Sequence, residues 1–223
     1  MSDRSSAPFR AIIFDMDGVL TDSEPAFHAA VNDILARYGQ TISLHDYEQF
    51  IGSATPAMWT GMIARFALPV TLEAILVEYE PVLMGRLRQP RPPLPGAREL
   101  LDELRAQGVP MALCTASYRR WVDAILPGAG LDGLFEVLST ADMVAQTKPD
   151  PAPYVLAAEM LGFAVGECVA VEDSVNGLTS AMRAGTHVVQ VRATATAAAP
   201  MAGVGRVIAS LREFPRELVV GGE

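Results

Sequence analysis

Short apolar runs that alternate with helical patterns are the strongest constraint on the fold of this chain. The runs span residues 10–15, 109–115, 135–139, 168–172 and 187–192. Segments with helical spacing fill most of the gaps, at residues 96–108, 118–126, 151–162 and 174–185. This alternation is typical of βα units, in which crossover helices join parallel strands. We therefore predict an α/β fold with a Rossmann-like parallel sheet flanked by helices.

The interval between the first and second apolar runs breaks this rhythm. Nearly all of the chain from Asp17 to Gly108 lacks strand character, whereas residues 26–39 and 71–87 have helical spacing. Residues 88–96, "RQPRPPLPG", have the composition of a short stiff linker. We expect an inserted all-α domain at residues 22–90 and a core made of residues 1–21 and 91–223.

Composition limits the possible partners. Half of the 223 residues are hydrophobic and the net charge is -9, spread along the chain. A basic surface for nucleic acid or an anionic membrane is therefore not expected, and small molecules are the expected partners.

No apolar stretch reaches the roughly 20 residues of a membrane span, and the start lacks a signal region. Cys114 and Cys168 lie in apolar segments, which favours reduced, buried thiols over a disulfide framework. We expect a cytoplasmic monomer, and assign no function to the alanine-rich residues 193–203.

Polar residues follow four of the predicted strands. They are Asp15, Asp17, Thr115, Lys148, Glu172 and Asp173. The carboxyl ends of parallel strands share one edge of the sheet, so these side chains should meet there. Four carboxylates would repel one another unless a cation neutralised them, and oxygen ligands favour Mg²⁺. With Lys148, Thr115 and a helix N-terminus nearby, the site is suited to an anion held through a metal, and phosphate is the natural candidate.

Each of these residues also has an ordinary structural explanation when it is taken alone. An Asp-x-Asp pair is often a solvated turn, and Glu172 with Asp173 could cap a helix. A threonine at a strand end is usually structural, and Lys148 precedes a proline as many surface lysines do. The catalytic interpretation therefore rests on the ordered set of motifs.

That ordered set resembles the haloacid dehalogenase superfamily of phosphohydrolases and phosphomutases. The four motifs are "DMDGVLTD", the threonine of "LCTAS", the lysine of "KPDP" and the acidic pair of "VEDS". The resemblance covers about residues 10–192, and the inserted domain matches the members whose cap lies between the first two motifs. "DGVLTDSEP", "KPDP" and "EDSVNG" look most like the branch that contains β-phosphoglucomutase and small sugar-phosphate phosphatases.

The resemblance implies a role for each motif residue. Asp15 would be the nucleophile that forms an aspartyl-phosphate, and Asp17 the general acid and base. Thr115 and Lys148 would bind the phosphoryl oxygens. Mg²⁺ would be held by Asp15, the backbone carbonyl of Asp17, and Asp173, with Glu172 close to the metal or its waters. Strand alternation lets Asp15 and Asp17 share a side while Met16 packs inward, and Gly18 permits a tight turn.

Three reactions occur in this superfamily, and the residues favour one. Dehalogenases lack the second aspartate, so Asp17 argues against that activity. A mutase must hold a second phosphate, but Phe27 stands at the position of its hinge histidine, with His28 next to it. Thr55 and Tyr118 stand at the positions of its arginine and lysine. The resemblance therefore favours a phosphatase, with a phosphomutase as the alternative and a non-catalytic sensor of phosphorylated ligands as a third reading.

The residues expected to contact substrate come from the inserted domain and from the segment after Thr115. They are Ser53, Thr55, Trp59, Ala116, Ser117 and Arg119. Small, apolar and hydroxyl groups would suit a compact phosphorylated metabolite such as a sugar or polyol phosphate. Two of these have alternatives: Trp59 could belong to the core of its domain, and Arg119 could simply begin a helix at the surface.

Overall fold

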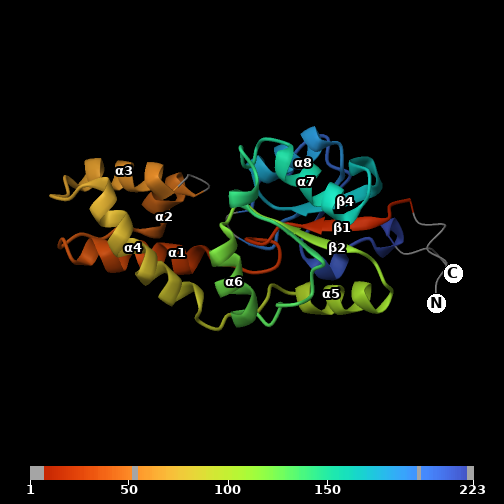
Figure 1. Cartoon of the computed structure of the whole chain (residues 1–223), viewed down its shortest axis with the longest axis horizontal. Helices are drawn as coiled ribbons and strands as arrows, with labels where there is room; N and C mark the ends of the chain where they lie inside the picture. The colour runs from red at the N-terminus through yellow and green to blue at the C-terminus, as the bar shows by residue number, and fades with distance from the viewer. Residues whose placement is uncertain (1–7, 52–54, 195–196, 220–223) are drawn as a thin grey trace. The chain divides into compact units, whose positions relative to one another are not determined.

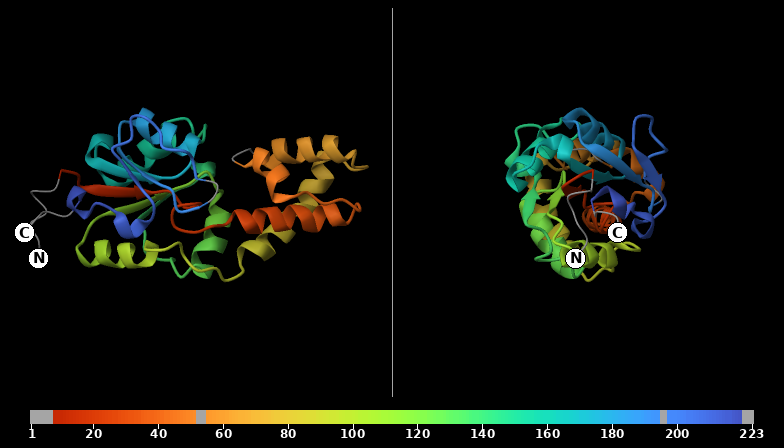
Figure 2. Two further views of the ribbon diagram at one scale, coloured as in Figure 1. Left: turned by 180° about the vertical axis from the view of Figure 1, so that it is seen from behind. Right: turned by 90° about the vertical axis from the view of Figure 1, so that its right-hand side faces the viewer.

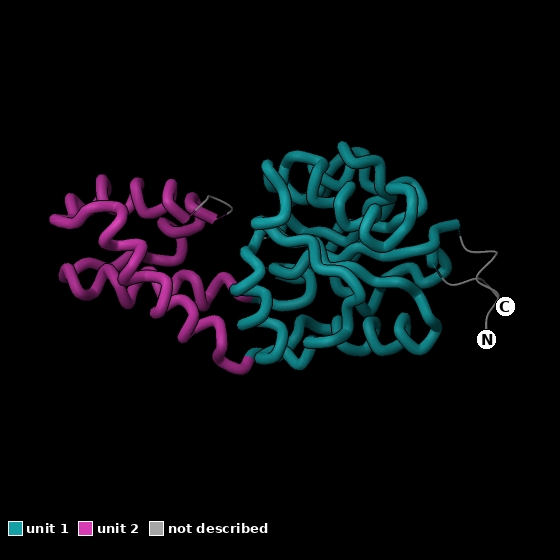
Figure 3. Tube along the Cα trace, viewed as in Figure 1, with its two compact units in different colours: residues 1–22, 91–223 teal, residues 23–90 magenta. Residues whose placement is uncertain are grey.

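The computed structural model describes residues 8–51, 55–194 and 197–219. The chain forms two compact units, one of residues 1–22 and 91–223 and one of residues 23–90 (Figure 3). No helix in the described ranges is long and apolar enough to cross a bilayer.

The larger unit is built on a parallel sheet of six strands in the order β3-β2-β1-β4-β5-β6 (Figure 1). The strands are β1 Ala11–Phe14, β2 Met111–Cys114, β3 Val137–Ser139, β4 Cys168–Glu172, β5 His187–Val191 and β6 Arg206–Ile208. β1 lies at the centre, between β2 and β4. The predicted α/β class and the five predicted strands are confirmed.

Helices fill the gaps between strands, as the alternation predicted. They are α5 Ala97–Ala106, α6 Arg119–Gly128, α7 Ala152–Leu161 and α8 Val175–Ala184. Short 3-10 turns occur at η3 Ala141–Met143, η4 Val165–Glu167, η5 Leu211–Glu213 and η6 Arg216–Leu218. The views in Figures 1 and 2 show α7 and α8 on one face of the sheet and α5 on the other.

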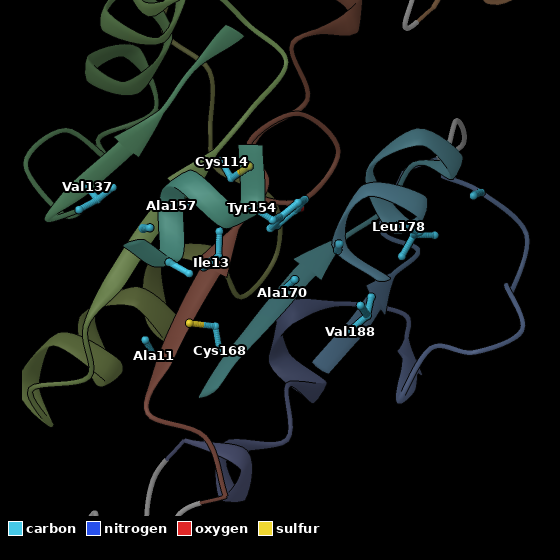
Figure 4. Close-up of a cluster of buried hydrophobic side chains, with 14 residues drawn as sticks. Ala11, Ile13, Cys114, Val137, Tyr154, Ala157, Cys168, Ala170, Leu178 and Val188 are labelled. Carbon is cyan, nitrogen blue, oxygen red and sulfur yellow. The ribbon is translucent and has the colours of Figure 1, made fainter. Parts of the chain in front are cut away.

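One layer of the core of this unit lies between the sheet and the pair α7 and α8 (Figure 4). Alternate residues of β1, Ala11 and Ile13, pack here with Tyr154 of α7 and Leu178 of α8. The side chains of a strand alternate, so Ile12 and Phe14 are buried on the opposite face. A strand that is buried on both faces has a continuous apolar sequence, which is why β1 could be predicted.

The sixth strand was not predicted. β6 has only three residues, and Arg206 and Val207 are exposed at the edge of the sheet. A strand of this length with two polar or exposed positions leaves too little apolar patterning for sequence analysis to detect.

The smaller unit is helical in its described residues. Its helices are α1 Glu24–Ala36, α2 Leu44–Tyr47, α3 Thr55–Phe66 and α4 Leu72–Leu87, with a 3-10 turn η2 Glu48–Phe50. α4 packs against both α1 and α3. Its buried face carries Ile75, Tyr79, Leu83 and Leu87, which recur at helical spacing.

Candidate active site

The first two site residues meet because β1 and β4 pair in register. Phe14 is paired with Val171, so Asp15 and Glu172, the next residue of each chain segment, come side by side at the carboxyl edge of the sheet. The backbone N–H of Asp15 donates to the carbonyl of Val171 at 2.9 Å. Met16, between the two aspartates of the first motif, is fully buried, as predicted.

Lys148 connects these two carboxylates. Its side chain is only 4% exposed, and its Nζ donates to Asp15 Oδ1 and to Glu172 Oε1. A third bond, 2.9 Å long, goes to the carbonyl of Cys114 at the end of β2. One ammonium group therefore joins the ends of β1, β2 and β4.

Glu172 has partners on both carboxylate oxygens. Oε1 accepts from Lys148 and from the hydroxyl of Tyr154 at 3.0 Å. Oε2 accepts from the backbone N–H groups of Asp173 and Ser174, at 3.0 and 3.2 Å, and from Ser174 Oγ at 3.2 Å. Ser174 is also the N-cap of α8, whose Gly177 N–H donates to Ser174 Oγ at 3.0 Å. The carboxylate is thus fixed against the start of α8.

Two glycines give the carboxylates room. A Cβ on Gly177 would lie 1.8 Å from Glu172 Oε1, and one on Gly18 would lie 2.0 Å from Asp173 Oδ2. Gly18 also has φ +84°, a left-handed conformation that glycine adopts without strain. The carboxylates of Glu172 and Asp173 therefore each lie directly against the backbone of a glycine, where no side chain would fit.

The three buried carboxylates of Asp15, Glu172 and Asp173 have ligand atoms within 4.8 Å of one another. Burial and the neighbouring Glu172 raise the pKa of Asp15 well above its usual value, although Lys148 opposes this. Burial, Glu172 and Asp15 raise the pKa of Asp173 to about 9. Burial lowers the pKa of Lys148, but its two carboxylate partners outweigh that effect and raise it. The cluster carries more negative charge than one lysine balances, and an all-oxygen donor set of this kind fits a hard divalent cation.

The segment after β2 brings two hydroxyls to the same edge. Thr115 Oγ1 accepts from the Ser117 N–H at 3.0 Å, and both residues are buried. Ser117 Oγ donates to Asp17 Oδ2 at 3.2 Å. The structure therefore brings Asp15, Asp17, Thr115, Ser117, Lys148, Glu172 and Asp173 together in one unit.

The remaining predicted contacts lie in other surroundings. Ala116 is exposed. Arg119 is also exposed, its backbone N–H donates to Asp142 and its side chain pairs with Asp123 one turn along α6. This agrees with the alternative in which Arg119 begins a helix at the surface.

The predicted contacts of the inserted segment belong to the helical unit. Thr55 is the first residue of α3, and Ser53 lies outside the described residues. Trp59 is fully buried and packs edge-on against Tyr79, with ring centroids 5.2 Å apart, so it belongs to the core of its own unit.

His28 also has an internal role in the helical unit. Its Nε2 lies 2.9 Å from the carbonyl of Ile42 and 3.0 Å from Asn32 Nδ2. The Asn32 side chain in turn accepts from the Ile42 N–H at 2.8 Å. These bonds tie α1 to the segment before α2, which is a structural use of this histidine.

Sequence reasoning missed two residues of the site. Tyr154, the third residue of α7, donates to Glu172, and in the sequence its buried aromatic ring looks like any other core residue. Gly177 was visible only as part of the "SVNG" helix start. A glycine inside a helix is itself a signal, because it is unfavourable there unless something lies close to its backbone.

Comparison with known proteins agrees with this geometry. A family model described as haloacid dehalogenase-like hydrolase matches residues 9–185. The chain belongs to this family. Hexitol phosphatase A of Escherichia coli K12 is 35% identical over 192 residues, which cover 83% of this chain and 84% of that protein. The phosphoglycolate phosphatase of Caulobacter vibrioides is 29% identical, over 78% of this chain and 75% of that protein.

A solved structure extends the likeness to the fold of a haloacid dehalogenase-like hydrolase. The crystal structure of CbbY from Rhodobacter sphaeroides in complex with phosphate has a TM-score of 0.81 at 25% identity, and covers 93% of this chain and 96% of that one. The predicted family and the predicted enzyme class, a phosphatase of this family, are confirmed.

Proposed function

We propose that this haloacid dehalogenase-like hydrolase releases phosphate from a small phosphorylated metabolite of the sugar or polyol phosphate type, with Mg²⁺ as its cofactor. The observation that carries this proposal is the buried cluster of Asp15, Glu172 and Asp173 around Lys148. The names of the relatives, hexitol phosphatase A and phosphoglycolate phosphatase, support a compact phosphate ester as substrate.

The hydrogen bonds suggest how the cluster would share the metal. Glu172 already uses both oxygens, on Lys148, Tyr154, Asp173 and Ser174. The carboxylates of Asp15 and Asp173 have fewer protein donors in the described residues, so they are the better direct ligands, together with the Asp17 carbonyl. Glu172 then fixes Lys148 and the start of α8. When bound, Mg²⁺ would supply positive charge that lowers the pKa of its carboxylate ligands and binds a phosphoryl oxygen.

The reaction follows from the positions of Asp15 and Asp17. An oxygen of ionised Asp15 attacks phosphorus and forms an acyl phosphate, while the bond from phosphorus to the ester oxygen breaks. Asp17 gives its proton to the departing alcohol. Asp17 then takes a proton from water, whose oxygen attacks the same phosphorus and frees Asp15 and inorganic phosphate. Lys148 and the Thr115 hydroxyl offset the charge on the transferred group throughout.

Hydrolysis is favoured over phosphoryl migration by the surroundings of the mutase-like positions. His28, the candidate for a shifted hinge histidine, is bonded to Ile42 and Asn32 within its own unit. Thr55 and Tyr118 add no positive charge where a mutase has cations. A bisphosphate would therefore lack the contacts that retain it between two transfers.

We assign the helical unit the role of a cap that closes during turnover. A cap would exclude bulk water and present side chains to the leaving group, which sets specificity. Thr55 and Ser53 are the proposed contacts of this unit, and Ala116, Ser117 and Arg119 those of the larger unit.

The test is release of inorganic phosphate from a panel of hexitol, sugar and glycolate phosphates, with Mg²⁺ or with EDTA. We expect metal-dependent release by the wild-type protein and none by Asp15→Asn. Formation of an isomeric phosphate without free phosphate would instead establish the mutase. Binding without any turnover would establish the sensor.

A further inference from the structure

Gln190 is an unusual residue for the middle of a sheet. It lies in β5, between β4 and β6, and is fully buried, as are its neighbours Val189 and Val191. A buried amide without hydrogen-bond partners costs about 1–3 kcal/mol, so the partners of this side chain explain why it is tolerated.

Among the described residues, the side chain of Gln190 bonds to one segment, residues 197–203, which we call the alanine segment. Nε2 donates to the carbonyls of Ala198 and Ala199, at 3.0 and 2.9 Å. Oε1 accepts from the N–H of Met201 at 2.9 Å. Both amide hydrogens and the amide oxygen are therefore bonded to the same short stretch of backbone.

The alanine segment reaches the acidic cluster through one further bond. The N–H of Ala198 donates to the backbone carbonyl of Asp173 at 2.8 Å. Arg192 Nε also donates to the carbonyl of Ala198, at 3.1 Å. Ala198 thus connects the Gln190 amide to the residue that follows β4.

The side chains of the alanine segment supply no hydrogen bonds that would fix its backbone. Its side chains are mainly methyl groups, which form no hydrogen bonds, and its sequence "AAAPMAG" has no capping or charged residue. Its backbone polar groups bond to side chains of β5 and of Arg192, while Ala198 and Met201 also pack against the hydrophobic core beside α7 and α8. Without Gln190, the carbonyl of Ala199 and the N–H of Met201 would lose this partner, and the carbonyl of Ala198 would keep Arg192 as its side-chain donor.

We propose that Gln190 is a positioning residue for Asp173. By fixing the alanine segment, Gln190 holds the Ala198 N–H against the Asp173 carbonyl and so fixes the direction in which the Asp173 carboxylate projects into the cluster. Gln190 itself touches neither substrate nor metal. This inference rests on the proposed Mg²⁺ site.

The test measures Mg²⁺ binding to the full-length protein by isothermal titration calorimetry. Gln190→Met keeps the size and buried position of the side chain but removes its three hydrogen bonds. Changes to groups that orient a metal ligand typically weaken binding 10–100-fold, and we expect about tenfold weaker Mg²⁺ binding here. The KM for substrate at saturating Mg²⁺ should stay at the wild-type value.

Val189→Ala is the matched control, because it opens a cavity in the same strand without touching the alanine segment. It should lower the melting temperature and leave the Mg²⁺ dissociation constant unchanged. If Val189→Ala weakens Mg²⁺ binding as much as Gln190→Met does, general loss of stability explains the effect and the inference is overturned.

Ala198→Pro provides a second variant, which removes the N–H donor and leaves Gln190 in place. It should weaken Mg²⁺ binding as Gln190→Met does, and the double variant should be no weaker than either single one. Wild-type affinity in both single variants would refute the positioning role while leaving the metal site intact. A wild-type protein that binds no Mg²⁺ would refute the metal site itself, and the inference with it.

Discussion

Replacing Gly177 with alanine tests whether α8 needs a residue without a side chain beside Glu172. A Cβ at residue 177 would lie 1.8 Å from Glu172 Oε1, so the carboxylate or the helix must move. Helix propensity alone predicts the opposite outcome. In the interior of a helix, alanine is more favourable than glycine by about 1 kcal/mol.

The hydrogen bonds of Glu172 decide which effect is larger. Its side chain is fully buried and accepts from Lys148, Tyr154 and Ser174, as described above. A hydrogen bond to a charged group contributes about 1.5–3 kcal/mol, and displacement of the carboxylate would break at least two of them. After subtraction of the gain in helix propensity, the free energy of unfolding should fall by about 2–5 kcal/mol.

Urea unfolding followed by circular dichroism measures this change. Gly85→Ala in α4 is the matched control, because the added Cβ meets no atom within 4 Å beyond its own chain neighbours and helix backbone. The control should stabilise the protein by about 1 kcal/mol. Gly177→Ala should also lose most phosphatase activity. Equal or greater stability than the wild type for Gly177→Ala, with full activity, would show that α8 tolerates a side chain beside Glu172.

Three further predictions concern the charges of the cluster. The raised pKa of Asp173, about 9 against an ordinary 3.8, means that the folded metal-free protein keeps a proton that the unfolded chain releases. In EDTA the melting temperature should therefore fall as pH rises between these values, and Mg²⁺ should raise it most at the alkaline end; a melting temperature that climbs with pH would contradict this. Lys148→Met leaves two buried carboxylates without their cation and should cost about 3–5 kcal/mol of unfolding free energy, less in Mg²⁺; an unchanged urea midpoint would argue against the ion pairs. Tyr154→Phe removes one donor to Glu172 and should cost about 1–3 kcal/mol, to be compared with Tyr38→Phe at a far less buried tyrosine.

The parts of the fold that the sequence predicted are those with a strong periodic signal. β1 and β4 are continuous apolar runs because both of their faces are covered, and α5 shows a clear apolar face with Leu100, Leu101 and Leu104. β6 escaped because an edge strand of three residues has too little pattern.

The site divides in the same way. Asp15, Lys148 and Asp173 could be grouped because parallel strands bring their carboxyl ends to one edge. The residues that position these side chains could not be predicted from the sequence. Tyr154 acts through one hydrogen bond to Glu172, and Gln190 acts through three bonds to the backbone of the alanine segment. Neither residue type nor spacing predicts such contacts.

We propose that Asp15 is the nucleophile of a phosphoryl transfer. Asp17→Asn should retain the first step with an aryl phosphate, whose leaving group needs no proton, and slow the second step, which does. Acid quenching of this variant with 4-nitrophenyl phosphate and Mg²⁺, followed by peptide mass spectrometry, measures the intermediate directly. We expect one phosphoryl group on Asp15, and none in the Asp15→Asn/Asp17→Asn double variant. Substrate turnover by the wild type without a phosphorylated Asp15 in any quenched sample, or with phosphate on a different residue, would contradict it.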